Sequence, residues 1–213
     1  MSFKFFLCVL CVLCVLCVPA CLQRPTSNPN VLVVAIPSGP NNLDPRIGLD
    51  DASQKIHALI FDSLFDLDSR MRVTPTLAER LDHPTPTTYI VTLRRGVPFQ
   101  DGHELTSADV VYTYRSFLDP DFVSGRKGGY RELRSVDATD RYTVVFTLDH
   151  PFTSFPINLV MPIVPDGAGP TLARHPVGTG PYRFVRYAVD DQIELESFND
   201  YFGGRPLNDG LIL

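Results

Sequence analysis

Cysteine is absent from residues 22–213, and tryptophan is absent from the whole chain of 213 residues. The five cysteines all lie within the first 21 residues, as Cys8, Cys11, Cys14, Cys17 and Cys21. The body of the chain therefore has no thiol that could form a disulfide, bind zinc as a thiolate or act as a cysteine nucleophile.

A surplus of basic residues is also missing. The chain has 19 Lys and Arg against 24 Asp and Glu, which gives a formal net charge of −5. A protein that holds phosphate backbones does so through counterion release by clustered cations, so we expect no nucleic-acid partner. The histidines are scattered, no spacing among them is diagnostic, and we expect neither a metal site nor a cofactor.

The amino-terminal segment has the layout of a secretory signal. One cation at Lys4 is followed by an apolar run over residues 5–18 and by the small residue Ala20. A stable membrane-spanning helix needs about 20 residues, and this run has 14. We therefore predict a signal peptide over residues 1–20, with an uncleaved membrane anchor as the alternative.

The sequence "VPAC" at the end of this segment resembles the lipobox of bacterial lipoproteins, although Pro19 departs from the usual pattern. The resemblance makes Cys21 a candidate lipid anchor, while ordinary cleavage by the general signal peptidase is the alternative. Residues 21–30 combine prolines with polar residues and are predicted to form a flexible tether.

The remaining chain shows a mixture of strand and helix patterns. Residues 31–36, "VLVVAI", form a continuous apolar run typical of a strand buried on both faces. Asp51 and Gln54 are placed to cap a following helix. Alternating or β-branched and aromatic residues predict further strands at residues 89–93, 142–148, 182–187 and 192–198.

The stretch "VPFQDGHELTSADVVYTY" at residues 97–114 is dense in acids and imidazole, which raises the question of a reaction centre. Gly102 after Asp101 instead favours a chain reversal. Thr106 with Asp109 three residues later predicts a capped helix with one apolar face. His103 lacks a second imidazole at metal-binding spacing, so we interpret the stretch as a capped turn.

Extended to residues 89–114, this stretch resembles the most recognisable segment of the family 5 extracytoplasmic solute-binding proteins. These are the receptor subunits of ABC importers for peptides, nickel complexes and related solutes. Three further segments resemble the family in the same order: "NNLDP", "VGTGPYRF" and "FNDYFGGRPLND". The chain departs from the family at Leu81 and Phe202, where tryptophan is common. This difference should affect side-chain packing more than the resemblance to the family.

The resemblance implies an α/β fold like that of type II periplasmic binding proteins, with a mixed sheet, flanking helices and two lobes that close on a solute. Residues 31–213 would form the N-terminal portion of lobe one, and the second lobe would be absent, so that the sequence is a fragment. The resemblance also implies a monomeric, exported receptor, periplasmic or on the outer face of the membrane, which has no catalytic residues and delivers its solute to an ABC permease. Oligopeptides or dipeptides are the expected solutes, ahead of nickel complexes and sugars.

The family also implies candidate ligand-binding residues. The loop after the first strand faces the cleft in the family, which here places Ser38, Gly39 and Pro40 where their backbone can pair with an extended peptide. A simple turn at Gly39 is the alternative. Gly178 and Thr179 of "GTGPY" are expected near the cleft. Pro181 and the lack of a third glycine argue against a nucleotide loop.

Two other classes of function stay open at this point. An exported hydrolase is the enzyme alternative, although the body lacks a Gly-x-Ser-x-Gly elbow, a His-Glu-x-x-His pair and any thiol. A surface interaction protein without a small-molecule ligand is the third class. Its best feature is the cation-rich segment "GRKGGYRELR" at residues 125–134, for which a solvated loop is the alternative.

Overall fold

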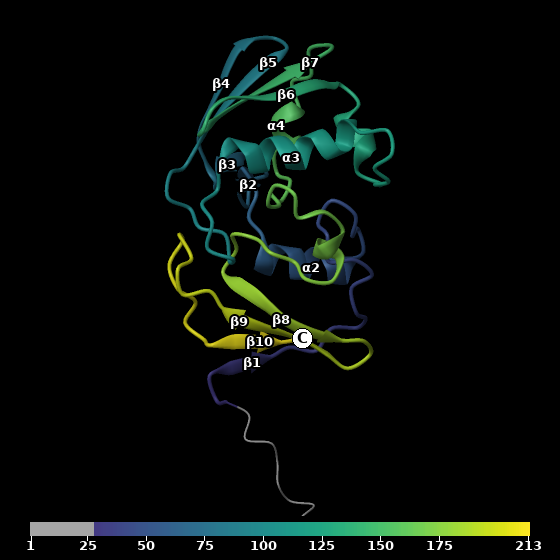
Figure 1. Cartoon of the computed structure of the whole chain (residues 1–213), viewed down its shortest axis with the longest axis vertical. Helices are drawn as coiled ribbons and strands as arrows, with labels where there is room; N and C mark the ends of the chain where they lie inside the picture. Colours follow the sequence, from purple (N-terminus) through teal and green to yellow (C-terminus); the bar gives the residue numbers. More distant parts are fainter. Residues whose placement is uncertain (1–27) are drawn as a thin grey trace, which may run out of the picture. The chain divides into compact units, whose positions relative to one another are not determined.

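The computed structural model describes residues 28–213, in which two four-stranded sheets and a two-stranded ribbon are accompanied by short and medium-length helices (Figure 1). The predicted signal peptide, Cys21 and tether residues 21–27 lie outside the described residues. Residues 32–213 form one compact unit. No helix in the described part of the chain has the length and apolarity needed to cross a membrane.

The first sheet has the strand order β1-β10-β9-β8, with β9 antiparallel to both of its neighbours. Its strands are β1 (Val31–Val33), β8 (Tyr182–Ala188), β9 (Gln192–Ser197) and β10 (Gly210–Ile212). Helix α2 (Asp51–Ile60) packs beside β8. The strands predicted at residues 182–187 and 192–198 are therefore confirmed.

The second sheet has the order β4-β5-β7-β6, and its neighbouring strands are all antiparallel. Its strands are β4 (Ala78–Thr85), β5 (Thr88–Leu93), β6 (Leu133–Asp140) and β7 (Thr143–Leu148). In β5 and β7 every second side chain is buried, as alternation along a sheet with one covered face requires. Helix α3 (Ser107–Leu118) packs against β6 and β7 (Figure 1).

The shorter elements connect these layers. Strands β2 (Phe65–Leu67) and β3 (Val73–Pro75) pair as the antiparallel ribbon. A short helix, α4 (Phe155–Asn158), and two 3-10 turns, η2 (Lys127–Tyr130) and η3 (Gly169–Ala173), complete the described elements. Tyr130 of η2 is buried, so the cation-rich segment at residues 125–134 is anchored in the core through its tyrosine.

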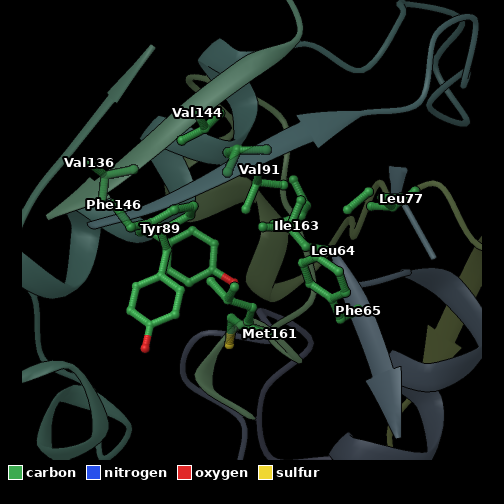
Figure 2. Close-up of a cluster of buried hydrophobic side chains, with 14 of the residues drawn as sticks. Leu64, Phe65, Leu77, Tyr89, Val91, Val136, Val144, Phe146, Met161 and Ile163 are labelled. Atoms are coloured by element: carbon green, nitrogen blue, oxygen red, sulfur yellow. The ribbon is translucent and has the colours of Figure 1, made fainter. Parts of the chain in front are cut away.

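The larger hydrophobic core lies between the second sheet, α3 and the segments around the ribbon. Figure 2 shows part of it, in which Val91 and Phe146 come from the sheet while Leu64, Met161 and Ile163 come from the connecting segments. All five side chains are at most 2% exposed. A smaller core forms between α2 and the first sheet.

The turn and helix predicted from residues 97–118 are both present. Gly102 has a φ of +96°, in the left-handed region that glycine adopts without steric cost. The Asp109 carboxylate accepts hydrogen bonds from the backbone N–H of Thr106 at 2.8 Å and from its hydroxyl at 3.0 Å, within a capping box. Asp119 ends the helix before Pro120.

Two local predictions need correction. Helix α2 is capped by Asp50, whose carboxylate accepts from the Ser53 N–H, so the predicted cap at Asp51 is wrong by one residue. The strand over residues 31–36 is short and is not buried on both faces, since Leu32 and Val33 are 55% and 65% exposed. The reason is its edge position: in the described part of the chain its partner strand is β10, on one side.

The segment "NNLDP" is held by a buried ion pair. Arg46 donates from Nη2 to Asp44 Oδ2 at 2.8 Å and from Nε to Oδ1 at 3.1 Å, and both side chains are at most 4% exposed. The Arg46 guanidinium also lies between the rings of Tyr112 and Phe122, at 5.2 and 5.0 Å from their centres. Burial opposes the charge, but the bonds to Asp44 keep the pKa of Arg46 raised. This loop is thereby fixed to α3.

Candidate functional site

The predicted loop of Ser38, Gly39 and Pro40 follows β1. Ser38 and Gly39 are exposed, whereas Pro40 is buried. Gly39 lies against Tyr187 of β8, because a Cβ at residue 39 would be 2.4 Å from the tyrosine hydroxyl oxygen. Within residues 28–213, the backbone groups of Ser38 and Gly39 make no hydrogen bond. The loop thus presents unpaired donors and acceptors beside the first sheet.

The predicted residues Gly178 and Thr179 are buried. A Cβ on Gly178 would lie 2.1 Å from the Ile60 carbonyl oxygen, so only glycine allows this approach of the chain to the end of α2. Gly180 donates its N–H to the same carbonyl at 2.8 Å. No hydrogen bond in the described part joins these residues to the Ser38 loop: Gly178 lies against Ile60, whereas Gly39 lies against Tyr187.

The side chain of Gln100, which the sequence reasoning did not single out, binds this junction together. Its Nε2 lies 3.0 Å from the Ile60 oxygen, 3.0 Å from the Gly180 oxygen and 2.8 Å from the Tyr182 oxygen. Its Oε1 accepts from the Gly178 N–H at 3.1 Å. Gln100 is 5% exposed. One amide therefore connects the turn before α3, the end of α2 and the start of β8.

Asp62, two residues after the end of α2, was also missed. Thr179 donates its hydroxyl to Asp62 Oδ2 at 3.0 Å, and Tyr201 donates its hydroxyl to Oδ1 at 3.3 Å. Burial raises the pKa of Asp62 to about 6, although both hydroxyls act in the opposite direction. Thr179 thus orients a carboxylate that is strongly perturbed, which is a feature of functional sites.

Asp62 lines a cavity of about 280 Å³ together with His57, Arg126 and Asp66, which we call the Asp62 cavity. His57 is 3% exposed, and burial lowers its pKa to about 4, with the nearby Arg126 charge acting in the same direction. The imidazole is therefore neutral at pH 7. An acid and a base with oppositely shifted pKa values line the same hollow.

A larger hollow of about 960 Å³ runs along α3 and the Asp44–Arg46 pair. The two arginines that line it already form ion pairs. Arg46 pairs with Asp44, and Arg115 pairs with Asp137 at 2.7 Å. It contains none of the predicted site residues. The Asp62 cavity is the better candidate, because it holds a half-buried carboxylate that forms no ion pair among residues 28–213 and lies beside the buried His57.

The acid-rich stretch around His103 is structural in this fold. His103 Nδ1 lies 2.6 Å from Asp101 Oδ1, its ring stacks on Phe99 at 4.4 Å, and Nε2 lies 3.4 Å from Asp109 Oδ1. Asp109 also accepts from the Asp166 N–H at 2.9 Å. These contacts close the turn onto α3. In the described part of the chain, no group of three or more potential ligands is placed to hold a metal ion.

Comparison with known protein sequences identifies related proteins. The profile described as bacterial extracellular solute-binding proteins, family 5 Middle, matches residues 72–213. Protein XP55 of Streptomyces lividans is 34% identical over 185 residues, which is 82% of this chain and 33% of the relative. The oligopeptide-binding protein AppA of Bacillus subtilis is 31% identical over 192 residues, 84% of this chain and 35% of the relative.

Solved structures agree with this similarity and with an α/β fold of sheets and flanking helices. AppA of Bacillus subtilis, in complex with a nonapeptide, superposes with a TM-score of 0.79 at 31% identity, over 85% of this chain and 39% of that one. DppA of Helicobacter pylori, in complex with the peptide STSA, gives a TM-score of 0.75 at 26% identity, over 85% and 42%. The chain spans about a third of the length of the curated relatives it matches.

The Gln100 contacts generate a stability prediction. Replacement Gln100→Leu keeps the approximate size of the side chain but leaves several buried carbonyl oxygens with fewer donors, and we expect a loss of about 2–4 kcal/mol in the free energy of unfolding. The measurement is urea denaturation of the full chain. Gln54→Leu is the control, since Gln54 is exposed and gives one bond to the Leu49 oxygen. Equal losses in both variants would contradict the role of Gln100.

The opposed pKa shifts of Asp62 and His57 generate a prediction about pH. Because the pKa of Asp62 is raised in the folded state, this group stabilises the fold fully below about pH 3.8. The contribution is lost as pH rises through about 6. Because the pKa of His57 is lowered in the folded state, this group stabilises the fold fully above pH 6.5. The contribution is lost as pH falls through about 4. As pH rises, the Asp62 contribution to the free energy of unfolding decreases while the His57 contribution increases. In Asp62→Asn only the His57 contribution should remain.

We therefore expect the difference in unfolding free energy, Asp62→Asn minus wild type, to increase as pH rises from 4 to 7. Urea denaturation at half-unit pH steps measures it. Asp121→Asn, which changes an exposed carboxylate outside the cavity lining, serves as the control. A pH-independent difference for Asp62→Asn would show that this carboxyl titrates normally.

Proposed function

Because the chain belongs to the bacterial extracellular solute-binding proteins of family 5, we propose that it is the solute-binding component of an ABC importer. It captures peptides outside the cytoplasm and delivers them to a membrane permease, which supplies the energy through its ATPase partner. Its own role is reversible binding without catalysis. The proposed receptor acts as a monomer.

The observation that carries the peptide assignment is the unpaired backbone of Ser38 and Gly39. An extended peptide can pair with such groups as an added strand, a mode that recognises the main chain and tolerates varied side chains. Related proteins support the same class of solute: AppA is named as oligopeptide-binding and GsiB of Salmonella choleraesuis, 33% identical over 180 residues, as glutathione-binding. Nickel complexes and sugars rank behind peptides.

The proposed site has two parts with different tasks. Ser38, Gly39 and Pro40 provide the main-chain contact surface. Gly178 and Thr179 are proposed to act through the Asp62 cavity, since the Thr179 hydroxyl holds the Asp62 carboxylate and Gly178 allows the close approach to α2. The observed burial of Thr179 fits a positioning role better than a direct contact with solute.

Export and anchoring form a separate part of the proposal. The signal-like residues 1–20 direct export, and the cysteine at position 21 becomes a diacylglycerol-modified amino terminus after cleavage. A lipid at this position would hold the receptor at the membrane surface near the permease. Residues 21–30 would then serve as the tether between the lipid and the fold.

Peptide capture is tested by calorimetric titration of the full chain with trialanine and with a nonapeptide. Gly39→Ala should weaken binding about tenfold, the value of one or two hydrogen bonds, because the new Cβ would displace the loop or the Tyr187 ring. Gly128→Ala is the matched control, since its Cβ would meet only the Arg131 guanidinium at 4.0 Å. Binding of neither peptide by the wild type would refute the proposed function.

Anchoring is tested by the intact mass of the protein from the membrane fraction of its own cells. We expect the amino-terminal peptide to begin at Cys21 and to carry a diacylglycerol, and Cys21→Ser to abolish both the modification and the membrane association. Cys17→Ser is the control, because it lies within the predicted signal peptide. An unmodified amino terminus at another residue would overturn the lipid anchor.

A further inference from the structure

Three aspartates of the chain are followed directly by glycine, at residues 101–102, 166–167 and 209–210. An Asp-Gly pair is chemically labile, because the glycine nitrogen can attack the side-chain carboxyl carbon and close a five-membered succinimide ring. Glycine permits this approach since it has no side chain in the way. The reaction needs a glycine N–H and a carboxyl group that are free of other bonds, and a backbone that can rotate.

The Asp-Gly pair at residues 101–102 is protected by its turn. Gly102 donates its N–H to the Phe99 oxygen at 2.9 Å. The Asp101 carboxylate is held by His103, whose Nδ1 lies 2.6 Å from Oδ1 and whose backbone N–H donates to the same oxygen at 3.3 Å. Both groups that would have to react are therefore already engaged.

The Asp-Gly pair at residues 209–210 is protected by the first sheet. Asp209 Oδ1 accepts from Arg205 Nη2 at 2.8 Å. Gly210 is a buried residue of β10, which pairs with β9. A Cβ at Gly210 would lie 2.4 Å from the Leu195 oxygen, so the backbone is packed too closely there to rotate.

The Asp-Gly pair at residues 166–167 has neither kind of protection. Asp166 and Gly167 are both exposed. Within residues 28–213, no hydrogen bond or ion pair engages the Asp166 carboxylate or the Gly167 N–H. Gly167 has a φ of +73°, and a Cβ there would meet no atom within 4 Å. Both reacting groups are thus free, and the turn that carries them has space to move.

We propose that Asp166 is a site of spontaneous isomerisation to isoaspartate. The Gly167 nitrogen attacks the carboxyl carbon of protonated Asp166, so that a C–N bond forms and a C–O bond breaks. The carboxyl hydroxyl leaves with the Gly167 N–H proton as one water. A second water then opens the ring at either carbonyl and yields aspartate or isoaspartate. The reaction consumes no oxidant and no cofactor, and it is independent of peptide capture.

Isomerisation changes the turn that Asp166 occupies. The Ala168 N–H donates to the Pro165 oxygen at 3.2 Å across this turn, and isoaspartate inserts one extra methylene into the main chain between them. The flanking bonds are fixed to α3, since the Asp166 N–H donates to Asp109 at 2.9 Å and the Gly169 N–H to a tyrosine hydroxyl at 3.0 Å. The added length is therefore taken up between these two bonds, beside the hollow of about 960 Å³ that Asp166 lines.

The proposal is tested by incubating the full chain in mildly acidic buffer, where part of the carboxyl groups is protonated. Peptides that cover the three Asp-Gly pairs are then compared by mass, since the succinimide is lighter by one water, and by electron-transfer fragmentation, which distinguishes isoaspartate from aspartate. We expect the two products at Asp166 to exceed those at Asp101 and at Asp209 at least about tenfold, because the protected pairs react only after local opening.

Two controls test whether the fold causes this difference. In guanidinium chloride the contacts of all three pairs are lost, so the three product yields should approach one another. Asp166→Glu keeps the charge but has to close a six-membered ring, and it should remove the products at residue 166 while leaving the other two pairs unchanged. The same ratio of products in the folded and unfolded chain, or yields at Asp101 or Asp209 that match the yield at Asp166 in the folded chain, would overturn the inference.

Discussion

The side-chain amide of Gln100 is the contact on which the candidate site depends. It gathers three carbonyl oxygens, from Ile60, Gly180 and Tyr182, and so joins segments that are 40 to 82 positions apart in the chain. Ile60 is the last residue of α2, and Asp62 follows it by two positions. Carbonyls at a helix end need donors when they are buried. The Gln100 amide and the Gly180 N–H together satisfy the Ile60 oxygen, two positions before Asp62.

The glycines of "GTGPY" have a role in the same junction. Gly178 and Gly180 let the chain approach Ile60 so closely that a Cβ at either position would lie within 2.1 to 2.6 Å of its backbone atoms. Thr179 lies between them and is fully buried, so its hydroxyl has a fixed direction toward Asp62. A motif that superficially resembles part of a nucleotide loop instead produces a closely packed, hydrogen-bonded support for one carboxylate.

Signals that reside within a few neighbouring residues were sufficient to predict much of this fold. Capping by Asp109 and alternation in β5 and β7 predicted their elements correctly, because short-range hydrogen bonds and one covered sheet face produce them. The edge position of β1 depends on which strands pair, and an apolar run does not carry that information. The Asp62 cavity was missed for a related reason: Thr179 is 117 positions from Asp62 and Tyr201 is 139, so no local spacing reveals the group.

The contacts of Asp62 also set the charge state of this half-buried carboxyl group. Two neutral hydroxyls, those of Thr179 and Tyr201, stabilise the carboxylate without cancelling its charge. Protons compete for the same oxygens, because burial and the Asp66 charge raise the Asp62 pKa to about 6, while the hydroxyls of Thr179 and Tyr201 act against them. Around neutral pH the carboxyl group of Asp62 is therefore mostly ionised. As pH falls below about 6, protonation increasingly removes this charge, so the hydroxyls of Thr179 and Tyr201 lose their charged acceptor in acid.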